Sequence, residues 1–364
     1  MIKKKIVIAT GGTGGHIFPA YSLANYLKNK NFSVKLTSDK RGSIYLKDYT
    51  DLNLIEIPSS PLIKKGIIKI FYSFSIISFS IIKSFFILLF DRPSVIFGMG
   101  GYSSFPICFA AFILRIKFII YENNLIIGKS NKYLLPFAKK IFVSYNELEG
   151  IPEKYKGKVI EVGNIVREEI INSKISHHGT TNFDSLKILV LGGSQAAKIF
   201  AEEFPQIFKK LKNSKIRIKI YQQCHYSQND QLSKFYEKAQ IDFEIFNFTT
   251  KIIDYYSKSN LVITRSGASV LGELINFKIP FISIPLPTSA DNHQYKNAKF
   301  YSQKGYGNFL EEKDIKDKLY ELIVSTFNNK SMLNAILVKQ RQHSDKDIFK
   351  NLNNHIEKIL NEKN

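Results

Sequence analysis

The segment KIVIATGGTGGHIFPA, residues 5–20, joins a short apolar run to a glycine-rich loop and then to a proline. An apolar run that ends in glycine is typical of a buried strand in a parallel sheet, and proline suits the opening turn of a helix. Gly11 to Gly15 would then bring backbone N–H groups towards an anionic or hydroxyl-rich ligand. The segment predicts an α/β fold with a binding loop after its first strand.

Similar strand, loop and helix units continue along the chain. The predicted strands are residues 5–9, 33–37, 95–97, 118–121 and 140–143 in the first half and residues 187–191, 216–221, 243–245, 261–264 and 281–284 in the second. The pattern restarts after Asn164, so we predict one domain at residues 1–163 and another at 164–344. Residues 345–364 predict an amphipathic helix that packs back on the first domain. Parallel sheets bind ligands at the carboxyl ends of their strands, so we expect a ligand in the cleft between the domains.

The composition is that of a folded globular protein. Of the 364 residues, 44% are hydrophobic and 23% are charged, which argues against a disordered or membrane-embedded chain. Cys108 and Cys224 lie in no CxxC or metal-ligand spacing, which favours a reducing compartment. Too few apolar residues precede the first glycines for a secretory signal. The lysines behind the net charge of +21 are spread along the chain, which favours attraction to anionic surfaces, including acidic lipid, over specific nucleic-acid binding.

Two further glycine loops follow predicted strands. FGMGGYSSFP covers residues 97–106, and LGGSQAA covers residues 191–197. The latter would present Ser194 and Gln195 at a helix start, where hydroxyl, amide and backbone donors can meet a phosphate or a base. Each loop alone is weak evidence for a ligand.

The most informative region is TRSGASVLGELINFKIPFISIPLPTSADNHQYKNA, residues 264–298. Gly267 permits a tight turn, and a helix starting near Ala268 would direct N–H groups at the cleft, where a diphosphate would fit. Glu273 follows about one and a half turns later, where a carboxylate could accept both hydroxyls of a ribose. The alternative for Glu273 is a solvated helix residue. The polar stretch beyond suits sugar hydroxyls, or is a plain surface loop, and contains Asp291, His293, Gln294 and Asn297.

His16 lies at the end of the first glycine loop. A histidine near its ordinary pKa can take a proton from an attacking hydroxyl, which contributes about 10²–10⁴ in rate. The alternative is a histidine that only hydrogen-bonds within the loop. A dinucleotide-binding fold with Asp39 as ribose ligand is another alternative, but GGTGGH does not match GxGxxG.

The segment LIKKGIIKIFYSFSIISFSIIKSFFILLF, residues 62–90, is long and apolar enough to raise the question of a membrane span. On a helical wheel one arc of about 100° holds the polar residues Lys69, Ser73, Ser80, Lys83 and Ser84. Isoleucines and phenylalanines occupy the other side, which is typical of a helix that lies in a membrane surface. Lys64 and Lys65 could each add about 1 kcal/mol near anionic lipid. A transmembrane helix and a buried core helix remain the alternatives.

The motifs GGTGGH, GMGGYSS, ENN…GKSN, GNIVR, GGSQAA, RSGASVLGE and HQYKNA occur in this order over nearly the whole chain. In these motifs the sequence resembles the MurG family of peptidoglycan N-acetylglucosaminyltransferases, in glycosyltransferase family 28. The resemblance implies a GT-B fold of two Rossmann-like domains, the first for the acceptor and the membrane and the second for the donor. It implies an inverting transfer of N-acetylglucosamine from UDP to the C4 hydroxyl of N-acetylmuramic acid in lipid I, giving lipid II.

The resemblance also assigns roles to individual residues. It implies that His16 is the catalytic base and that Glu273, the second residue assigned to catalysis, holds the ribose. The residues implied to contact the donor are Thr13, Gly14, Gly15, Asn124, Arg167, Ser194, Gln195, Thr249, Gly267, Ala268, Ser269, Glu273, His293, Gln294 and Asn297, with the backbone near Phe248. Those implied for the acceptor side are His16, Tyr102, Ser103, Glu122 and Asn131, joined there by Gly14, Gly15 and Asn124.

Some positions differ from the family pattern. Residues 121–124 read YENN where the family usually has HEQN, and Ala196 replaces the last glycine of GGSQGA. Val270 and His293 stand where the family often has Thr or Gln, which puts those two donor contacts in question. The implied base, the ribose carboxylate and the uracil-side arginine are kept.

No cofactor is expected, because a helix N-terminus can hold the charge of the departing UDP without an obligatory metal. The DxD of Asp345 and Asp347 lies in a lysine-rich tail, far from a strand end, and is not expected to bind metal. The partners implied are UDP-N-acetylglucosamine, lipid I, an anionic membrane surface and proteins of cell-wall synthesis, with no nucleic acid. The implied location is peripheral, on the cytoplasmic face of the inner membrane.

Two other functions remain open at this point. A nucleotide-sugar epimerase can share this two-domain architecture, and a non-catalytic nucleotide-binding module is the second alternative. The loop GMGGYSS and the apolar helix favour transfer over epimerisation. A histidine on a glycine loop disfavours a module without catalysis.

Overall fold

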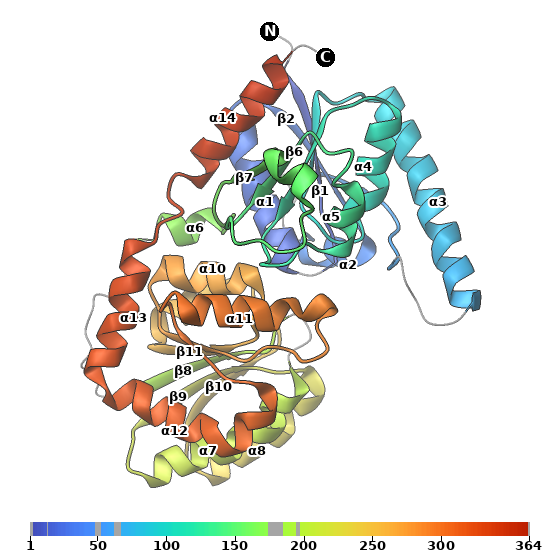
Figure 1. Cartoon of the computed structure of the whole chain (residues 1–364). Coiled ribbons are helices and arrows are strands. Elements are labelled where there is room, and N and C mark those ends of the chain that lie inside the picture. The colour runs from blue at the N-terminus through green and yellow to red at the C-terminus, as the bar shows by residue number, and fades with distance from the viewer. Residues whose placement is uncertain are drawn as a thin grey trace. The chain divides into compact units, whose positions relative to one another are not determined.

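The computed structural model describes residues 3–12, 14–47, 52–61, 67–173, 185–193 and 197–362. The chain divides into two compact units. Unit 1 comprises Met1–Glu168 with Asp345–Asn364, and unit 2 comprises Glu169–Ser344. Each unit has its own parallel sheet with helices packed on it (Figure 1). The division predicted after residue 163 lies five residues before the observed one at 168, and the C-terminal helix belongs to unit 1.

The sheet of unit 1 has the order β3-β2-β1-β4-β5-β6-β7, and its described strands are all parallel. They are β1 (Lys5–Ala9), β2 (Ser33–Ser38), β3 (Asn53–Glu56), β4 (Val95–Gly98), β5 (Phe118–Glu122), β6 (Lys140–Val143) and β7 (Val159–Glu161). Every side chain of β4 and β5 is buried, because helices cover both faces of the central strands. The order reverses between β1 and β4, which is where such sheets bind ligands.

The described helices of unit 1 lie on both sides of this sheet. They are α1 (Gly14–Asn29), α2 (Lys40–Tyr45), α3 (Ile67–Phe90), α4 (Ser104–Ile113), α5 (Lys129–Leu134), the 3₁₀ helix η1 (Glu153–Lys158) and α14 (Ile348–Asn361). α6 (Glu168–Ile171) lies at the division between the units.

α14 is fixed to unit 1 at both of its ends. Phe349 stacks on Tyr26 of α1, with ring centroids 5.1 Å apart. The ammonium of Lys117 donates to the last carbonyls of α14, where a cation also complements the helix dipole. Before the helix, Asp345 accepts hydrogen bonds from N and Nδ2 of Asn164 at 3.1 and 3.2 Å.

The sheet of unit 2 has the order β10-β9-β8-β11-β12-β13, again with all described strands parallel. The strands are β8 (Leu186–Leu191), β9 (Ile218–Gln223), β10 (Asp242–Phe246), β11 (Leu261–Thr264), β12 (Phe281–Ser283) and β13 (Asn308–Phe309). The described helices are α7 (Lys198–Asn213), α8 (Asn229–Lys238), α9 (Ile252–Lys258), α10 (Ala268–Phe277), α11 (His293–Gln303), α12 (Ile315–Asn328) and α13 (Lys330–Gln342), with short 3₁₀ turns η2 (Tyr226–Gln228), η3 (Ala290–Asn292) and η4 (Glu312–Asp314). The order reverses between β8 and β11, next to the loop that precedes α10.

The predicted α/β class is confirmed. Each predicted strand corresponds to an observed one, with ends shifted by at most two residues. β3, β7 and β13 were not predicted. They are short strands at sheet edges, half exposed, so their sequences lack the apolar run that marks a central strand.

Candidate functional site

The first glycine loop of unit 1 is held by the buried carboxylate of Asp39. Its Oδ1 accepts hydrogen bonds from the N–H groups of Gly12 and Gly42 at 3.0 and 2.9 Å, and its Oδ2 accepts one from Ser59 Oγ at 2.7 Å. Burial alone would raise the pKa of Asp39, but these donors and the guanidinium of Arg41 lower it to about 2. Asp39 therefore organises the loop with its oxygens, which removes the ribose ligand on which the dinucleotide alternative depended.

His16 lies in the first turn of α1, half-buried, with its imidazole against the second glycine loop. A Cβ on Gly100 would lie 3.3 Å from Cε1 of His16, and one on Gly101 would lie 3.7 Å from Cδ2. Both glycines also have positive φ, at +82° and +76°. The backbone therefore favours glycine at both positions, and at Gly100 the imidazole also leaves little room for a side chain.

The second glycine loop packs closely on the first. A Cβ on Gly11 would lie 2.0 Å from Oγ of Ser103, so only glycine fits at that position. Ser103 is buried, and within the described part of the chain its hydroxyl has no hydrogen-bond partner. Tyr102 beside it is half-buried. The structure thus brings together the predicted residues of both loops of unit 1.

Glu122 at the end of β5 organises the third predicted acceptor segment. Its Oε1 accepts a hydrogen bond from Nδ2 of Asn124 at 2.9 Å, and its Oε2 accepts from Gly128 N at 2.8 Å and Asn131 Nδ2 at 3.0 Å. Glu122 and Asn131 are both buried, and Asn124 is half-buried. The carboxylate therefore holds the segment in shape, and its contact with an acceptor stays a prediction.

Arg167 belongs to unit 1, although the resemblance assigns it to the donor. Its guanidinium lies over the ring of Phe18 in α1, with Cζ 4.1 Å from the ring centroid. The preceding backbone is fixed, because Ile165 N donates to the hydroxyl of Tyr121 at 3.0 Å. The residues predicted for the donor thus come from both units.

In unit 2 the loop after β11 leads directly into α10. Gly267 is the N-cap residue, and Gly267 and Ala268 present N–H groups that a helix does not use itself. The hydroxyl of Ser266 before them is fully buried and has no partner among the described residues. A Cβ on Gly267 would meet nothing nearer than Val270 Cγ1 at 3.9 Å. Folding therefore does not require glycine at position 267, but close approach of a ligand would.

Glu273 lies on α10, where only 6% of its surface is exposed. Its Oε2 accepts a hydrogen bond of 3.0 Å from the hydroxyl of Tyr256 on α9. The alternative of a solvated helix residue is therefore wrong. Thr249 lies in the loop before α9, half-buried, and accepts from Lys251 N at 3.0 Å, while Phe248 is exposed.

The polar stretch after β12 divides into residues that face the protein and residues that are partly exposed. Asn297 is fully buried, and its Nδ2 donates to the carbonyl of Ser266 at 3.1 Å. Gln294 is half-buried and accepts from Leu286 N at 2.9 Å. His293 is also half-buried, with Nδ1 2.8 Å from the carbonyl of Ala290. Asn297 thus braces the α10 loop, whereas His293 and Gln294 keep exposed surface for a ligand.

Part of the predicted site lies outside the described residues. This holds for Thr13 in the first loop, for Ser194, Gln195 and Ala196 in the third, and for Lys64 and Lys65 before α3. Among the described residues no group of three or more His, Cys, Asp and Glu is placed to hold a metal ion. The carboxylate of Asp345, in the DxD sequence, is buried and bound by Asn164. Cys108 and Cys224 are buried thiols, and burial raises the pKa of Cys224 to about 11.

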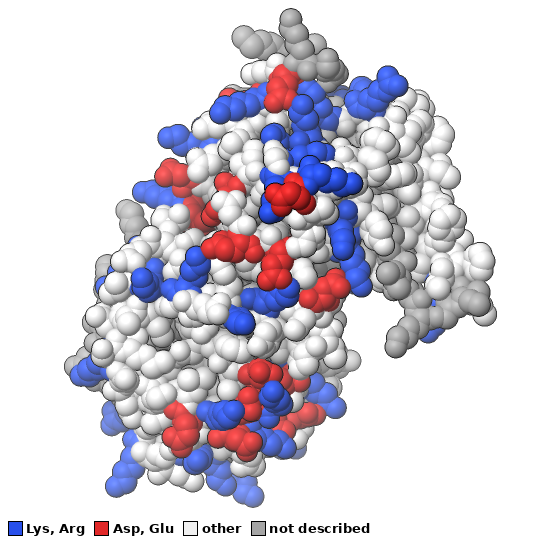
Figure 2. Space-filling model, in the orientation of Figure 1, with Lys and Arg blue, Asp and Glu red and all other residues white. Residues whose placement is uncertain are grey.

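α3 turns the serines of its polar arc inwards and its apolar side outwards, while Lys69 and Lys83 of that arc stay exposed. Ser73, Ser80 and Ser84 are buried, and Ser80 Oγ donates to the carbonyl of Pro58 at 2.8 Å. Phe71 and Phe74 on the outer side are each 68% exposed. Among the described helices, α3 is the one that is long and apolar enough to cross a membrane by length and composition. Its side of unit 1 is largely without charge in Figure 2, and Lys and Arg border it.

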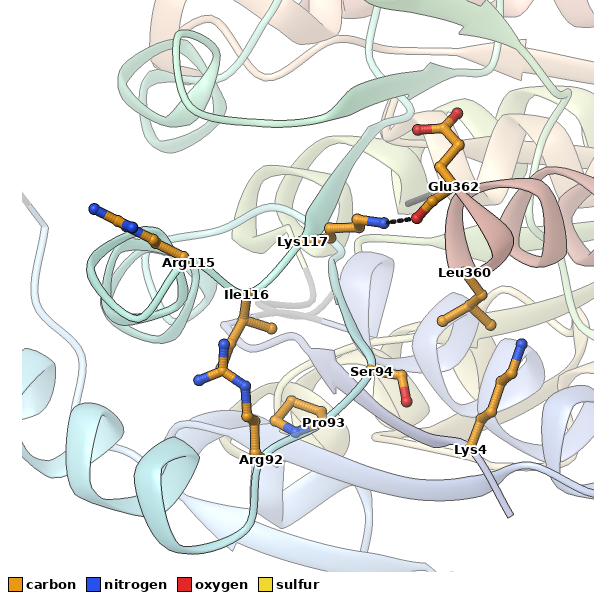
Figure 3. A pocket seen from close by; sticks show the side chains of 9 residues that line it. All are labelled: Lys4, Arg92, Pro93, Ser94, Arg115, Ile116, Lys117, Leu360 and Glu362. Carbon is orange, nitrogen blue, oxygen red and sulfur yellow. Dashed lines mark hydrogen bonds between the residues drawn. The ribbon is translucent and has the colours of Figure 1, made fainter. Parts of the chain in front are cut away.

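Two adjoining cavities lie at the amino ends of β1, β4, β5 and β6, and enclose about 300 and 590 Å³. Lys4, Arg92, Arg115 and Lys117 line the smaller one, where Lys117 reaches the end of α14 (Figure 3). Phe112 and Phe137 line the larger one together with further lysines. The glycine loops lie at the other end of the strands, so these cavities hold none of the predicted site residues.

Comparison with known proteins matches both units. The model of the glycosyltransferase family 28 N-terminal domain matches residues 6–143, and that of the glycosyltransferase family 28 C-terminal domain matches residues 187–352. A curated relative from Pelagibacter ubique is 35% identical and covers 99% of this chain and 100% of its own length. One from Rickettsia felis is 36% identical over 91% of this chain and 92% of its own. Both are named UDP-N-acetylglucosamine–N-acetylmuramyl-(pentapeptide) pyrophosphoryl-undecaprenol N-acetylglucosamine transferase.

Solved structures share the fold over almost the whole chain. The crystal structure of MurG from Acinetobacter baumannii has a TM-score of 0.75 at 24% identity and covers 98% of this chain and 99% of its own. A putative UDP-N-acetylglucosamine 2-epimerase from Listeria monocytogenes has a TM-score of 0.70 at 14% identity, with 100% and 98% covered. The predicted GT-B architecture is confirmed. From the identity and coverage of the curated relatives, the chain belongs to the MurG family of N-acetylglucosamine transferases, in glycosyltransferase family 28.

Proposed function

We propose that this chain transfers N-acetylglucosamine from UDP to the C4 hydroxyl of N-acetylmuramic acid in lipid I, the undecaprenyl-pyrophosphoryl-linked pentapeptide precursor, and so produces lipid II. The observation that carries the proposal is the arrangement on α10. N–H groups at Gly267 and Ala268 begin the helix, and the buried carboxylate of Glu273 follows on the same helix. A diphosphate at the N-terminus and a ribose at the carboxylate fit this spacing of an anion site and a hydroxyl acceptor.

The reaction is a single displacement, which inverts the anomeric centre. His16 takes the proton of the acceptor hydroxyl as its oxygen attacks the anomeric carbon, and the bond to the UDP oxygen breaks. The N-terminus of α10 stabilises the charge that develops on the departing diphosphate. Oriented amides thus provide what a metal ion provides in other transferases, so the reaction needs no obligatory metal.

Unit 1 holds the acceptor in this proposal. Tyr102, Ser103 and the segment that Glu122 organises lie close to His16 in the described structure, since Gly100 borders both His16 and Asn131. Such a cluster of hydroxyl and amide groups beside a half-buried imidazole suits a sugar acceptor. The epimerases share the fold but act on the donor sugar alone, so an acceptor cluster favours transfer.

We propose that unit 1 also docks on the cytoplasmic face of the inner membrane, as a peripheral protein. An isolated membrane span would bury its serines and lysines in lipid, whereas the serines of α3 are buried against unit 1 and Lys83 donates to the carbonyl of Glu56 at 2.9 Å. The exposed phenylalanines can then enter the lipid surface, and the cations of the two cavities can meet acidic headgroups. Proteins of cell-wall synthesis that work on the same lipid are candidate partners.

The test is product analysis with UDP-N-acetylglucosamine and a defined polyprenyl acceptor. A disaccharide on the lipid only when acceptor is present supports transfer. A free epimerised sugar without acceptor would support an epimerase instead, and binding without turnover would support a module. Under saturating substrates we expect His16→Ala to lower the rate about 10²–10⁴-fold, because proton transfer loses its base. His225→Ala, at an exposed histidine of unit 2, serves as the control and should leave the rate unchanged. Unchanged turnover in His16→Ala would eliminate the assigned base.

A further inference from the structure

Arg265 at the end of β11 carries a guanidinium that is almost completely enclosed, with 7% of the residue exposed. Its Nη1 donates to the carbonyls of Ile284 and Pro285, each at 3.3 Å. Its Nη2 forms an ion pair with Glu312. Its Cζ lies 4.6 Å from the ring centroid of Phe200. One side chain thus contacts three separate segments of unit 2.

These contacts all lie near the carboxyl ends of the strands of the sheet. Ile284 and Pro285 follow β12 and lead into the stretch with His293 and Gln294, and Glu312 follows β13. Phe200 lies in the first turn of α7, just after the third glycine loop. Arg265 itself directly precedes the α10 loop. The guanidinium therefore connects the start of the α10 loop with the segments after β12 and β13 and with the first turn of α7.

A charge in this position is costly for stability alone. Burial lowers the pKa of Arg265, and Glu312 acts in the opposite direction by favouring the charged form. A buried ion pair commonly adds little net stability compared with apolar residues of similar volume. What a planar guanidinium does supply is fixed geometry, since its fork can hold two carbonyls and a carboxylate at once.

We propose that Arg265 is a positioning residue for the donor, an inference that rests on the function proposed above. Arg265 holds the loop before α10 in register with the loop after β12. The N–H groups of Gly267 and Ala268 therefore meet the diphosphate without rearrangement. Preorganised donors of this kind stabilise a developing charge more than mobile ones do.

Asn297 completes the brace from the other side. Its buried amide donates to the carbonyl of Ser266, which adjoins Arg265. Gln294, three residues earlier in α11, is tied to the backbone of Leu286. The guanidinium therefore couples the α10 loop to the loop after β12 directly, and the amide of Asn297 couples the two loops through α11. Loss of either contact should loosen the diphosphate site.

The experiment compares Arg265→Lys and Glu312→Gln with wild type. Lysine keeps the charge but lacks the fork, and glutamine keeps the shape of its partner but lacks the charge. Glu203→Gln is the matched control, because Glu203 forms an ion pair with Lys316, at 3.3 Å in the same unit, in which Arg265 takes no part. Each variant is measured for UDP affinity by calorimetry, for thermal unfolding, and for kcat and for KM of both substrates.

We expect Arg265→Lys to weaken UDP binding about 10-fold or more, and Glu312→Gln to do so by a smaller factor. kcat should fall with UDP affinity, while KM for the lipid acceptor stays within about twofold of wild type. A merely structural role would lower the folded fraction and leave the UDP affinity of folded protein unchanged. If Arg265→Lys fails to fold, Glu312→Gln decides the matter by the same readouts.

Folded variants that bind UDP as tightly as wild type would overturn the positioning role and leave the proposed function intact. Wild-type protein that binds no UDP would instead refute the proposed function, and the inference with it. Glu203→Gln must match wild type throughout. An equal loss of UDP affinity in that control would assign the effect to general loosening of unit 2.

Discussion

The binding loops of the two units are braced by side chains of opposite charge. In unit 1 the buried carboxylates of Asp39 and Glu122 accept hydrogen bonds from backbone N–H groups of their loops. In unit 2 the buried guanidinium of Arg265 donates to backbone carbonyls. The first kind of brace uses up N–H groups of its loop, whereas the second uses up carbonyls and leaves the N–H groups of its loop to other partners.

This difference bears on where a nucleotide binds. An anion is stabilised by N–H groups at a helix N-terminus and by positive charge nearby. In the described part of the chain α10 begins at Gly267 without a side-chain cap, while the first glycine loop gives the N–H of Gly12 to a carboxylate. The sequence predicted that both loops offer N–H groups to a ligand, yet their braces predict that UDP binds to unit 2. Nucleotide bound to unit 1 alone would contradict both the comparison and the proposed mechanism.

The largest expected effect comes from removing the brace of unit 1. In Asp39→Ala the N–H groups of Gly12 and Gly42 and the guanidinium of Arg41 lose a buried acceptor. The free energy of unfolding should therefore fall by about 3 kcal/mol. UDP affinity of the folded protein should stay at the wild-type value, because unit 2 is untouched. Denaturant unfolding and calorimetry measure the two quantities.

Asp317→Ala, at an exposed carboxylate of α12, is the control for Asp39→Ala and should leave stability within about 0.5 kcal/mol of wild type. A clear loss of UDP affinity in Asp39→Ala would mean that the first glycine loop binds the nucleotide after all. The contrast between the braces would then fail.

The pH dependence of the free energy of unfolding tests the hydrogen bonds of Asp39 in a second way, with a smaller expected effect. The pKa of Asp39 is lowered to about 2 in the folded protein from an ordinary value of 3.8. A carboxyl with a depressed folded pKa contributes stability above its unfolded pKa, and this is lost as pH falls through the folded pKa. We expect about 2 kcal/mol to disappear between about pH 5 and pH 2. Asp39→Asn should not show this pH-dependent loss in its free energy of unfolding. If wild type and Asp39→Asn lose the same stability between about pH 5 and pH 2, the expectation is wrong.

Gly267→Ala tests whether a diphosphate approaches the backbone closely at the start of α10. The unliganded structure has room for a Cβ there, with the nearest atom at 3.9 Å, so thermal unfolding should not change. A diphosphate that approaches the backbone closely would meet the methyl group, and UDP affinity should fall about 10-fold. Gly157→Ala, where a Cβ meets nothing within 4 Å, is the control in unit 1. Undiminished UDP affinity in Gly267→Ala would place the diphosphate elsewhere.

The central strands were predictable from the sequence because burial on both faces leaves a continuous apolar run, as in β4 and β5. The edge strands were not, because β3 and β7 are half exposed and carry no such run. The orientation of α3 was not predictable either. Its polar arc was recognised, but a helical wheel does not say which side faces the protein. Ser73 and Ser80 hydrogen-bond to Ser60 and to the carbonyl of Pro58, so this side faces the protein, and Phe71 and Phe74 lie outside.

The sequence pointed to the loops that carry the candidate residues, but not to the contacts that these residues make within the protein. Glu122 and Asn297 were assigned to substrates, and the structure shows Glu122 in hydrogen bonds with its own segment and Asn297 in one with the α10 loop. Arg265 stands inside a quoted motif and was not singled out. Its role depends on Ile284 and Glu312, which are distant in sequence and meet it only through the parallel order of β11, β12 and β13. Spacing along the chain carries no signal for such contacts.

The smallest expected effect concerns the membrane, where unit 1 again differs from unit 2. Arg115 is exposed, lines both cavities and follows the exposed residues Phe112 and Ile113 of α4. Arg115→Gln should weaken binding to vesicles with acidic lipid by about 1 kcal/mol at low salt, because one cation near the surface is lost. The difference from wild type should shrink at high salt, where exposed charges are screened. Lys209→Gln, at an exposed lysine of unit 2, should bind as wild type does. If wild-type binding to acidic vesicles is itself negligible at low salt, α3 and its neighbouring cations do not form a membrane-docking surface.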